Sequence, residues 1–213
     1  MTMPAMTSLS NPYFIAAVLG AYLVGSLSFA VITSRLMGLA DPRSYGSGNP
    51  GATNVLRSGS KAAAIITLVF DALKGYLPVL AVFIWGQPLG LGQGAAMAVG
   101  LAAFIGHLWP VFFRFQGGKG VATAAGVLFA LNPLLGVATL ASFGLIVAFS
   151  RMVSLASMVA AAFAPFYQAL IWGLGPVVWG TAVMGALLIW RHQANIARLL
   201  AGTESKLGAK KHG

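Results

Sequence analysis

Cysteine is missing from this chain of 213 residues, and acidic residues are nearly missing, with 3 against 13 Lys and Arg. Without cysteine the chain has no thiol nucleophile, no thiolate metal site and no disulfide. The acids are Asp41, Asp71 and Glu204, too few for most paired-carboxylate catalysis or for a carboxylate-rich magnesium site. We therefore expect neither a metal nor another cofactor.

Charged residues of both signs are also scarce, at 8% of the chain, whereas 58% of the residues are hydrophobic. A soluble domain carries about a quarter charged residues, so these few side chains are not enough to cover a globular surface in water. We expect lipid to be the surrounding solvent. The net charge of +10 does not indicate a nucleic-acid partner, because the cations are dispersed through an apolar chain.

Long apolar runs predict an all-α, polytopic membrane helix bundle with seven transmembrane helices, in a single domain of residues 1–213. A span needs about 20 apolar residues to cross roughly 30 Å of hydrocarbon. The expected spans are 13–34, 62–85, 94–113, 121–131, 134–149, 153–172 and 176–190, the last continuing toward Leu200. The fourth is short, about 17 Å of helix, so it begins inside the membrane, is extended by its glycine-rich flank, or is re-entrant.

Basic residues predict the orientation, because Lys and Arg collect in cytoplasmic loops. Twelve of the 13 cations fall in segments 35–61, 114–119, 151 and 191–211, which share one side if all seven spans cross; Lys74 is the exception. We therefore expect the N-terminus outside and the C-terminus in the cytoplasm. The first span is expected to be retained, because residues 1–12 contain no basic residue of the kind that opens a signal peptide.

A glycine-rich segment, the first loop (46–57), follows the first span. Glycine lets the backbone approach an anion, Ser, Thr and Asn add neutral donors, and Arg adds a bidentate phosphate fork. An ordinary turn between helices is an equally good interpretation, whereas a dinucleotide site is excluded because a membrane span precedes the Gly-x-Gly-x-x-Gly pattern. The candidate ligand residues are Gly46, Ser47, Gly48, Asn49, Thr53, Asn54 and Arg57.

A second loop (117–120, Gly-Gly-Lys-Gly) directly precedes the short fourth span. A helix that begins here points its first N–H groups and the positive end of its dipole toward Lys119, which suits a phosphate. The alternative is a Lys that snorkels at a membrane boundary, which leaves the flanking glycines unexplained. The candidate residues are Gly117, Gly118, Lys119, Gly120 and Thr123.

A third polar segment (191–204) ends the last span. His192 and Asn195 are three residues apart on one helical face, and Gly202 suits a helix end. The His is suited to donating to a phosphate or accepting a proton near neutral pH. An interfacial helix with Arg191 and Arg198 on anionic lipid is an equally good interpretation.

Ionisable groups also occur within spans. Asp71 and Lys74 have the i, i+3 spacing that lets them neutralise one another, either as a functional pair or as a structural one. His107 is expected to be a packing residue, and Ser154 to lie at a helix contact.

Phosphate binding without a metal is the chemistry that these features favour. Two function classes fit it, an enzyme that joins two phosphate-bearing substrates and a transporter of one anion. A transporter needs a polar path through the bilayer, whereas only Asp71 and Lys74 are charged within a span. A noncatalytic assembly factor leaves both glycine-rich loops unexplained.

Five motifs occur in order over nearly the whole chain: GSGNPGATNVLR (46–57), DALKG (71–75), GHLWP (106–110), FQGGKGVATAAG (115–126) and RHQANIARLLAGTE (191–204). Together they resemble the acyl-phosphate:glycerol-3-phosphate acyltransferase family of bacterial membranes. The resemblance implies a seven-span enzyme of the bacterial inner membrane with its active site at the cytoplasmic face. It moves an acyl group from acyl-phosphate to the 1-hydroxyl of sn-glycerol 3-phosphate and yields lysophosphatidic acid and phosphate.

The resemblance also implies partners and residue roles. The partners are the two substrates and membrane lipid, and we expect a monomer. The loop around Lys119 is the implied glycerol phosphate site, and Glu204 is expected to support the structure by pairing with a nearby cation. The residues expected to be catalytic are Ser47, Arg57, Lys119, His192 and Asn195.

Overall fold

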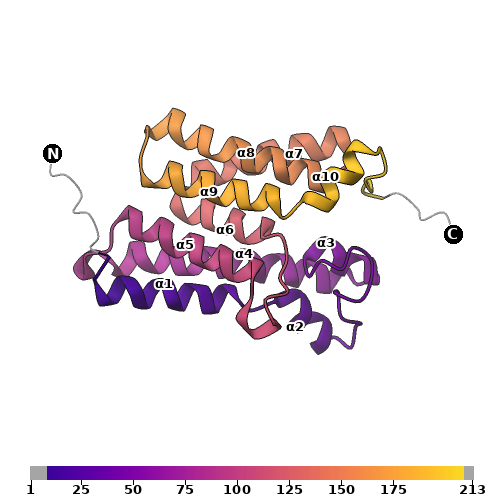
Figure 1. Cartoon of the computed structure of the whole chain (residues 1–213), viewed down its shortest axis with the longest axis horizontal. Helices are drawn as coiled ribbons and strands as arrows, with labels where there is room; N and C mark the ends of the chain where they lie inside the picture. The colour runs from indigo at the N-terminus through magenta and orange to yellow at the C-terminus, as the bar shows by residue number, and fades with distance from the viewer. Residues whose placement is uncertain (1–8, 209–213) are drawn as a thin grey trace. The chain divides into compact units, whose positions relative to one another are not determined.

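The computed structural model describes residues 9–208, which form helices joined by loops (Figure 1). The chain divides into two compact units, unit 1 ending at Asn132 and unit 2 beginning at Pro133. The α-helices of unit 1 are α1 (Pro12–Gly25), α2 (Phe29–Leu36), α3 (Ala52–Val55), α4 (Lys61–Trp85), α5 (Gln93–Leu108) and α6 (Val121–Leu131). Unit 1 also has the 3-10 helices η1 (Leu56–Ser58), η2 (Gln87–Leu89) and η3 (Val111–Phe113). Unit 2 has α7 (Pro133–Ser150), α8 (Val153–Trp172), α9 (Pro176–Trp190) and α10 (Gln193–Leu200).

The helices support a multi-pass membrane protein, but fewer than seven of the described stretches are long and apolar enough to be candidate spans. Four stretches are long and apolar enough to cross a membrane: 61–85, 93–113, 133–150 and 153–172. The pair α1 and α2 makes a fifth if its 44° bend lies within one span, and α6 and α9 are apolar but shorter. The structure therefore has four or five candidate spans among the described residues, and the count of seven stays a prediction.

Two expected spans are interrupted. The first breaks between α1 and α2, where the Ser26 hydroxyl donates to the carbonyl oxygen of Tyr22 at 2.8 Å, a bond of the kind that bends helices. Lys74 Nζ donates to the carbonyl oxygen of Leu27 at 2.7 Å, so a backbone carbonyl group at the break has a hydrogen-bond partner inside unit 1. The prediction that the last span runs on to Leu200 is wrong, because α9 ends at Trp190 and a separate helix begins at Gln193.

Glycines bring the helices of unit 1 into backbone contact. A side chain at Gly75 of α4 would overlap the carbonyl oxygen of Thr123 in α6, and one at Gly126 of α6 would overlap that of Ala72 in α4. Such close approach between small residues drives association of helices in lipid. Helix α4 also packs on α1, α2, α3 and α5, so it is the centre of unit 1 and fixes the start of α6.

Unit 2 is a simpler arrangement. Its three long helices lie side by side, with α8 packed against both α7 and α9 (Figure 1). The short helix α10 follows α9 after a break of two residues, and its end is closed by a bond from the Thr203 N–H to the carbonyl oxygen of Arg198 at 2.8 Å. Gly202 has a φ of +69° at this turn, which fits its predicted role at a helix end.

Candidate active site

Asn54 organises the first loop from within. Helix α3 turns its side chain inward, where it is 2% exposed. Its Oδ1 accepts hydrogen bonds from the Ser47 N–H at 3.0 Å and from Arg57 Nη1 at 3.2 Å. Its Nδ2 donates to the carbonyl oxygens of Pro42 at 2.6 Å and Tyr45 at 3.1 Å. The amide therefore has protein partners on both ends and holds the two predicted catalytic residues of this loop.

The remaining predicted ligand residues of the first loop lie toward its surface. Asn49 is half-buried, and Gly46 and Gly48 adopt positive φ angles of +62° and +67° that favour glycine. A side chain at Gly46 would also overlap Asn54 Oδ1. The exposed members are Gly46, Ser47, Gly48, Thr53 and Arg57.

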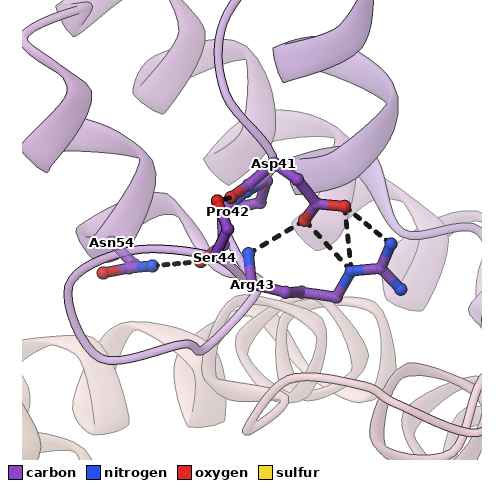
Figure 2. Close-up of polar contacts among 5 residues, drawn as sticks. All are labelled: Asp41, Pro42, Arg43, Ser44 and Asn54. Carbon is purple, nitrogen blue, oxygen red and sulfur yellow. Dashed lines mark hydrogen bonds and ion pairs between the residues drawn. The ribbon is translucent and has the colours of Figure 1, made fainter.

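An ion pair braces the start of this loop (Figure 2). Both Nε and Nη2 of Arg43 donate to the Asp41 carboxylate, with Nη2 to Oδ2 at 2.6 Å. These hydrogen bonds from Arg43 lower the pKa of Asp41 despite partial burial, which acts to raise it. The Arg43 guanidinium also lies 6.0 Å from the ring centroid of Phe113. One cation thus links the segment before the first loop to η3, which precedes the second loop.

The second loop packs against the end of α5, and this packing explains its glycines. A side chain at Gly117 would overlap the carbonyl oxygens of His107 and Leu108, and one at Gly120, where φ is +80°, would overlap the ring of Phe104. The Gly118 N–H donates to the carbonyl oxygen of His107 at 3.1 Å. The Gly118 N–H of the predicted cradle therefore already has a partner in the protein.

The two cationic loops meet in unit 1. An added Cβ at Gly118 would lie 3.0 Å from the carbonyl oxygen of Pro50, a residue of the first loop. Helix α6 begins at Val121, directly after the second loop, as predicted. Lys119 is half-buried between the three buried glycines. The structure therefore brings Lys119 and the first loop into one region, which suits binding of phosphate groups.

A polar cluster lies beneath the second loop. Lys74 Nζ is 2.8 Å from Asp71 Oδ1, which confirms the predicted pair. His107 Nδ1 lies 3.6 Å from the same oxygen and 3.2 Å from Thr123 Oγ1. Thr123 is 0% exposed and its hydroxyl faces His107, so the structure places this predicted substrate ligand inside the protein. We call these four residues the buried cluster.

In unit 2, His192 lies at the break between α9 and α10. The side chain is 2% exposed, and its Nδ1 is 2.8 Å from the carbonyl oxygen of Leu188. A carbonyl oxygen only accepts, so Nδ1 carries the proton of this bond and the neutral ring has its lone pair on Nε2. This tautomer suits a hydrogen-bond acceptor or a base.

Glu204 organises the surroundings of Asn195. Its Oε1 accepts from Asn195 Nδ2 at 2.7 Å and from Ser154 Oγ at 2.8 Å, while Oε2 accepts from Arg198 Nε at 2.7 Å. Burial acts to raise the pKa of Glu204, but the hydrogen bonds from Ser154, Asn195 and Arg198 outweigh it, so the pKa is lowered. The predicted pairing of Glu204 with a nearby cation is confirmed, with Arg198 as the cation.

Sequence reasoning missed three of these contacts. His107 was expected only to pack, and Ser154 only to lie at a helix contact, but His107 reaches Asp71 and Thr123 and Ser154 reaches Glu204. Nothing in the spacing of these residues indicates the contacts, because each joins separate helices or a helix and the tail. The sequence predicts that Asn54 binds the substrate, whereas its contacts described above are with Ser47 and Arg57 of the first loop and with Pro42 and Tyr45 before it.

Known proteins resemble this chain over most of its length. A family model described as glycerol-3-phosphate acyltransferase matches residues 15–202. A glycerol-3-phosphate acyltransferase of Paraburkholderia phytofirmans is 58% identical over 191 residues, which cover 90% of this chain and 89% of the relative. One from Ralstonia nicotianae is 60% identical over 191 residues, covering 90% and 92%.

Two crystal structures of PlsY (YgiH), an integral membrane glycerol 3-phosphate acyltransferase, are also similar. The glycerol 3-phosphate form has a TM-score of 0.86 at 39% identity, and the lysophosphatidic acid form has 0.84 at 38%. Each comparison covers 92% of this chain and 96% of the other. The motifs, the helical membrane fold and these matches agree: the chain belongs to the glycerol-3-phosphate acyltransferase family.

Proposed function

We propose that this chain transfers an acyl group from acyl-phosphate to the 1-hydroxyl group of sn-glycerol 3-phosphate. One observation carries the proposal: a relative that matches 92% of the chain is known in a glycerol 3-phosphate form and a lysophosphatidic acid form. These molecules are one substrate and one product of the proposed reaction. The choice of acyl-phosphate as the donor is supported by the resemblance of the five motifs.

The reaction needs little chemistry from the protein. The 1-hydroxyl oxygen attacks the acyl carbonyl carbon, a new ester bond forms, and the bond from that carbon to the phosphate oxygen breaks. The hydroxyl proton passes to a base or to the departing phosphate. Because acyl-phosphate is a mixed anhydride with a good leaving group, positioning, charge neutralisation and donors for the oxyanion supply the catalysis.

The cations and donors of unit 1 suit this task. Arg57 and Lys119 hold phosphate groups, and Ser47 donates its hydroxyl to the acyl carbonyl or to a phosphate. The adjacency of the two loops supports this assignment, since Gly118 lies beside Pro50. The proposed substrate-binding residues are Gly46, Gly48, Asn49, Thr53, Gly117, Gly118 and Gly120. Asn54 and Thr123 are buried and contact protein groups, so we propose that they support these residues.

The residues of unit 2 serve the attacking group. His192, with Nδ1 donating to Leu188, offers Nε2 to the 1-hydroxyl, either as a base or as an acceptor that orients it. Asn195, whose amide is held by Glu204, is the second residue that we assign to this task. Kinetics of His192→Gln separate the two roles, because a kcat near that of the wild type contradicts a general base and supports proton transfer to a substrate phosphate.

We also propose that the chain crosses the bacterial inner membrane seven times as a monomer and a single domain. The N-terminus lies outside, and the active site and C-terminus face the cytoplasm, as the distribution of Lys and Arg supports. Because the chain has no cysteine, single introduced cysteines can be labelled from one side of intact spheroplasts without background. Labelling of Gly208→Cys from outside contradicts this orientation.

The test of the function is direct. Purified protein in detergent receives palmitoyl-phosphate and radiolabelled glycerol 3-phosphate in EDTA, with palmitoyl-CoA in a parallel reaction. We expect labelled lysophosphatidic acid from palmitoyl-phosphate alone, and at least a 100-fold lower rate from Arg57→Gln. No product, or product only from the CoA ester, overturns the proposal. Uptake of glycerol 3-phosphate into vesicles without acylation indicates a transporter instead.

A further inference from the structure

The buried cluster combines side chains from three helices of unit 1. Asp71 and Lys74 come from α4, His107 from α5 and Thr123 from α6, and their exposures are 2%, 3%, 7% and 0%. Lys74 Nζ lies 2.8 Å from Asp71 Oδ1, and it also donates to the carbonyl oxygen of Leu27. The charges of Asp71 and Lys74 therefore offset each other without a third group.

His107 adds polarity to a cluster that is already neutral. Burying a further polar ring costs free energy that an apolar side chain of similar volume does not. Its Nδ1 faces Asp71 Oδ1 at 3.6 Å and Thr123 Oγ1 at 3.2 Å, so one edge of the ring is held by α4 and α6. Charge balance alone does not explain why a His occupies this place.

The other edge of the ring supplies an explanation. His107 Nε2 is so close to Gly118 that a side chain there would overlap it. The backbone of the same residue accepts the Gly118 N–H at 3.1 Å. His107 and Pro50 of the first loop thus both border Gly118, since an added Cβ would overlap His107 Nε2 and lie 3.0 Å from the Pro50 oxygen.

We propose that His107 is a positioning residue that holds the second loop against the first one and so sets the affinity for glycerol 3-phosphate. This inference rests on the proposed function. Asp71 and Thr123 fix the plane of the ring, the ring fixes Gly118, and Gly118 fixes the adjacent Lys119. His107 acts on the substrate through the second loop, since its own side chain is buried beneath that loop.

The test compares two variants of His107. His107→Leu removes both polar edges, whereas His107→Asn keeps a polar group toward Asp71 and Thr123 but does not extend to Gly118. In both, we expect the KM for glycerol 3-phosphate to rise about tenfold, the effect of weakening one charge-assisted hydrogen bond. We expect kcat and the KM for acyl-phosphate to change less than about threefold. If His107→Leu does not fold, His107→Asn alone provides the measurement.

A matched control is Thr67→Val, which removes a buried hydroxyl from α4 and leaves the ring of His107 in place. Its kinetic constants are expected to equal those of the wild type. An unchanged KM for glycerol 3-phosphate in His107→Asn, or equal losses in both substrates and kcat, overturns the proposal.

A second measurement does not depend on turnover. Hydrogen–deuterium exchange of residues 117–120 is expected to accelerate about tenfold in both His107 variants and to stay unchanged in Thr67→Val. Unchanged exchange in the His107 variants overturns the positioning role even if the wild type proves inactive. Absence of product from the wild type with accelerated exchange in the variants contradicts only the proposed function.

Discussion

Asn54 in unit 1 and Glu204 in unit 2 are both side chains that connect polar partners, but one is neutral and the other is charged. Asn54 binds Ser47 and Arg57 with Oδ1 and two carbonyl oxygens with Nδ2. Glu204 accepts from Ser154, Asn195 and Arg198. A neutral amide orders Arg57 without cancelling its charge, whereas the carboxylate offsets the charge of Arg198. The first arrangement suits an anion site, and the second suits a rigid support.

The largest expected effect comes from replacing the neutral amide of Asn54 by a carboxylate like that of Glu204. Asn54→Asp places a carboxylate beside Arg57 and leaves the carbonyl oxygens of Pro42 and Tyr45 without their amide donor. We expect kcat/KM to fall by about 100-fold or more, since a buried side chain loses two hydrogen bonds and the charge of Arg57 is offset. Steady-state acyl transfer measures this effect.

Asn11→Asp is the matched control for this change. It also removes an amide donor, the one from Nδ2 to the carbonyl oxygen of Leu89 at 2.8 Å, but it keeps the helix cap at Tyr13 and lies at the start of α1. Its kcat/KM is expected to stay within about twofold of the wild type. Equal losses in the two variants show that the charge near Arg57 has no special effect.

The reverse change in unit 2 is expected to have a smaller effect. Glu204→Gln keeps the shape but weakens charge-assisted bonds from Arg198 and Asn195, because the new NH2 group faces a donor. We expect a loss of about 2 kcal/mol in stability and a fall in kcat of less than about tenfold. Thermal unfolding in detergent and acyl transfer measure the two quantities. A fall in kcat of more than about tenfold shows that Glu204 takes a direct part in the reaction.

The pH dependence of stability gives a third test. Because the pKa of Glu204 is lowered below its ordinary value of 4.5, its contribution is fully present above that value and is lost as the pH falls below it. The difference in Tm between wild type and Glu204→Gln is therefore expected to be constant from about pH 7 to pH 5 and to shrink below about pH 4.5. A difference that grows on acidification contradicts the lowered pKa.

The smallest effect is expected at the Asp41–Arg43 pair. The same replacement of acid by amide, Asp41→Asn, alters side chains that are 39% and 31% exposed, so solvent screens the interaction. We expect a loss of less than about 1 kcal/mol in stability and unchanged kcat. Thermal unfolding of Asp41→Asn and Glu204→Gln under the same conditions compares their losses of stability. Equal losses in the two variants show that burial of Glu204 has no added effect.

The sequence predicts those parts of the structure that depend on neighbouring residues. Apolar runs locate the helices, the i, i+3 spacing predicts the pair of Asp71 and Lys74, and the glycines locate the loops. The break in the first span escapes prediction because the helices on both sides of it are apolar and the break depends on a local hydrogen bond at Ser26. A pattern of hydropathy contains no signal for such a bond.

Contacts across the fold are the part that the sequence does not predict. His107 and Asp71 are on different helices, and their proximity depends on the backbone contacts of α4 with α6 through Gly75 and Gly126. The sequence predicts that Asn54 belongs to a polar segment, but its inward direction depends on the single helical turn of α3. The polar character and spacing of residues identify candidates for the active site. The tertiary contacts decide which of these residues hold the others in position.

The ion pair of Asp71 and Lys74 also bears on how the protein enters the membrane. Each charge alone at the centre of α4 adds roughly 2.5 to 3.5 kcal/mol to the free energy of insertion. Since the two groups are one helical turn apart and form their contact within α4 itself, the helix can pair them before any other helix arrives. Helix α4, the centre of unit 1, is thereby able to leave the translocon as a neutral segment and serve as the surface on which the later helices assemble.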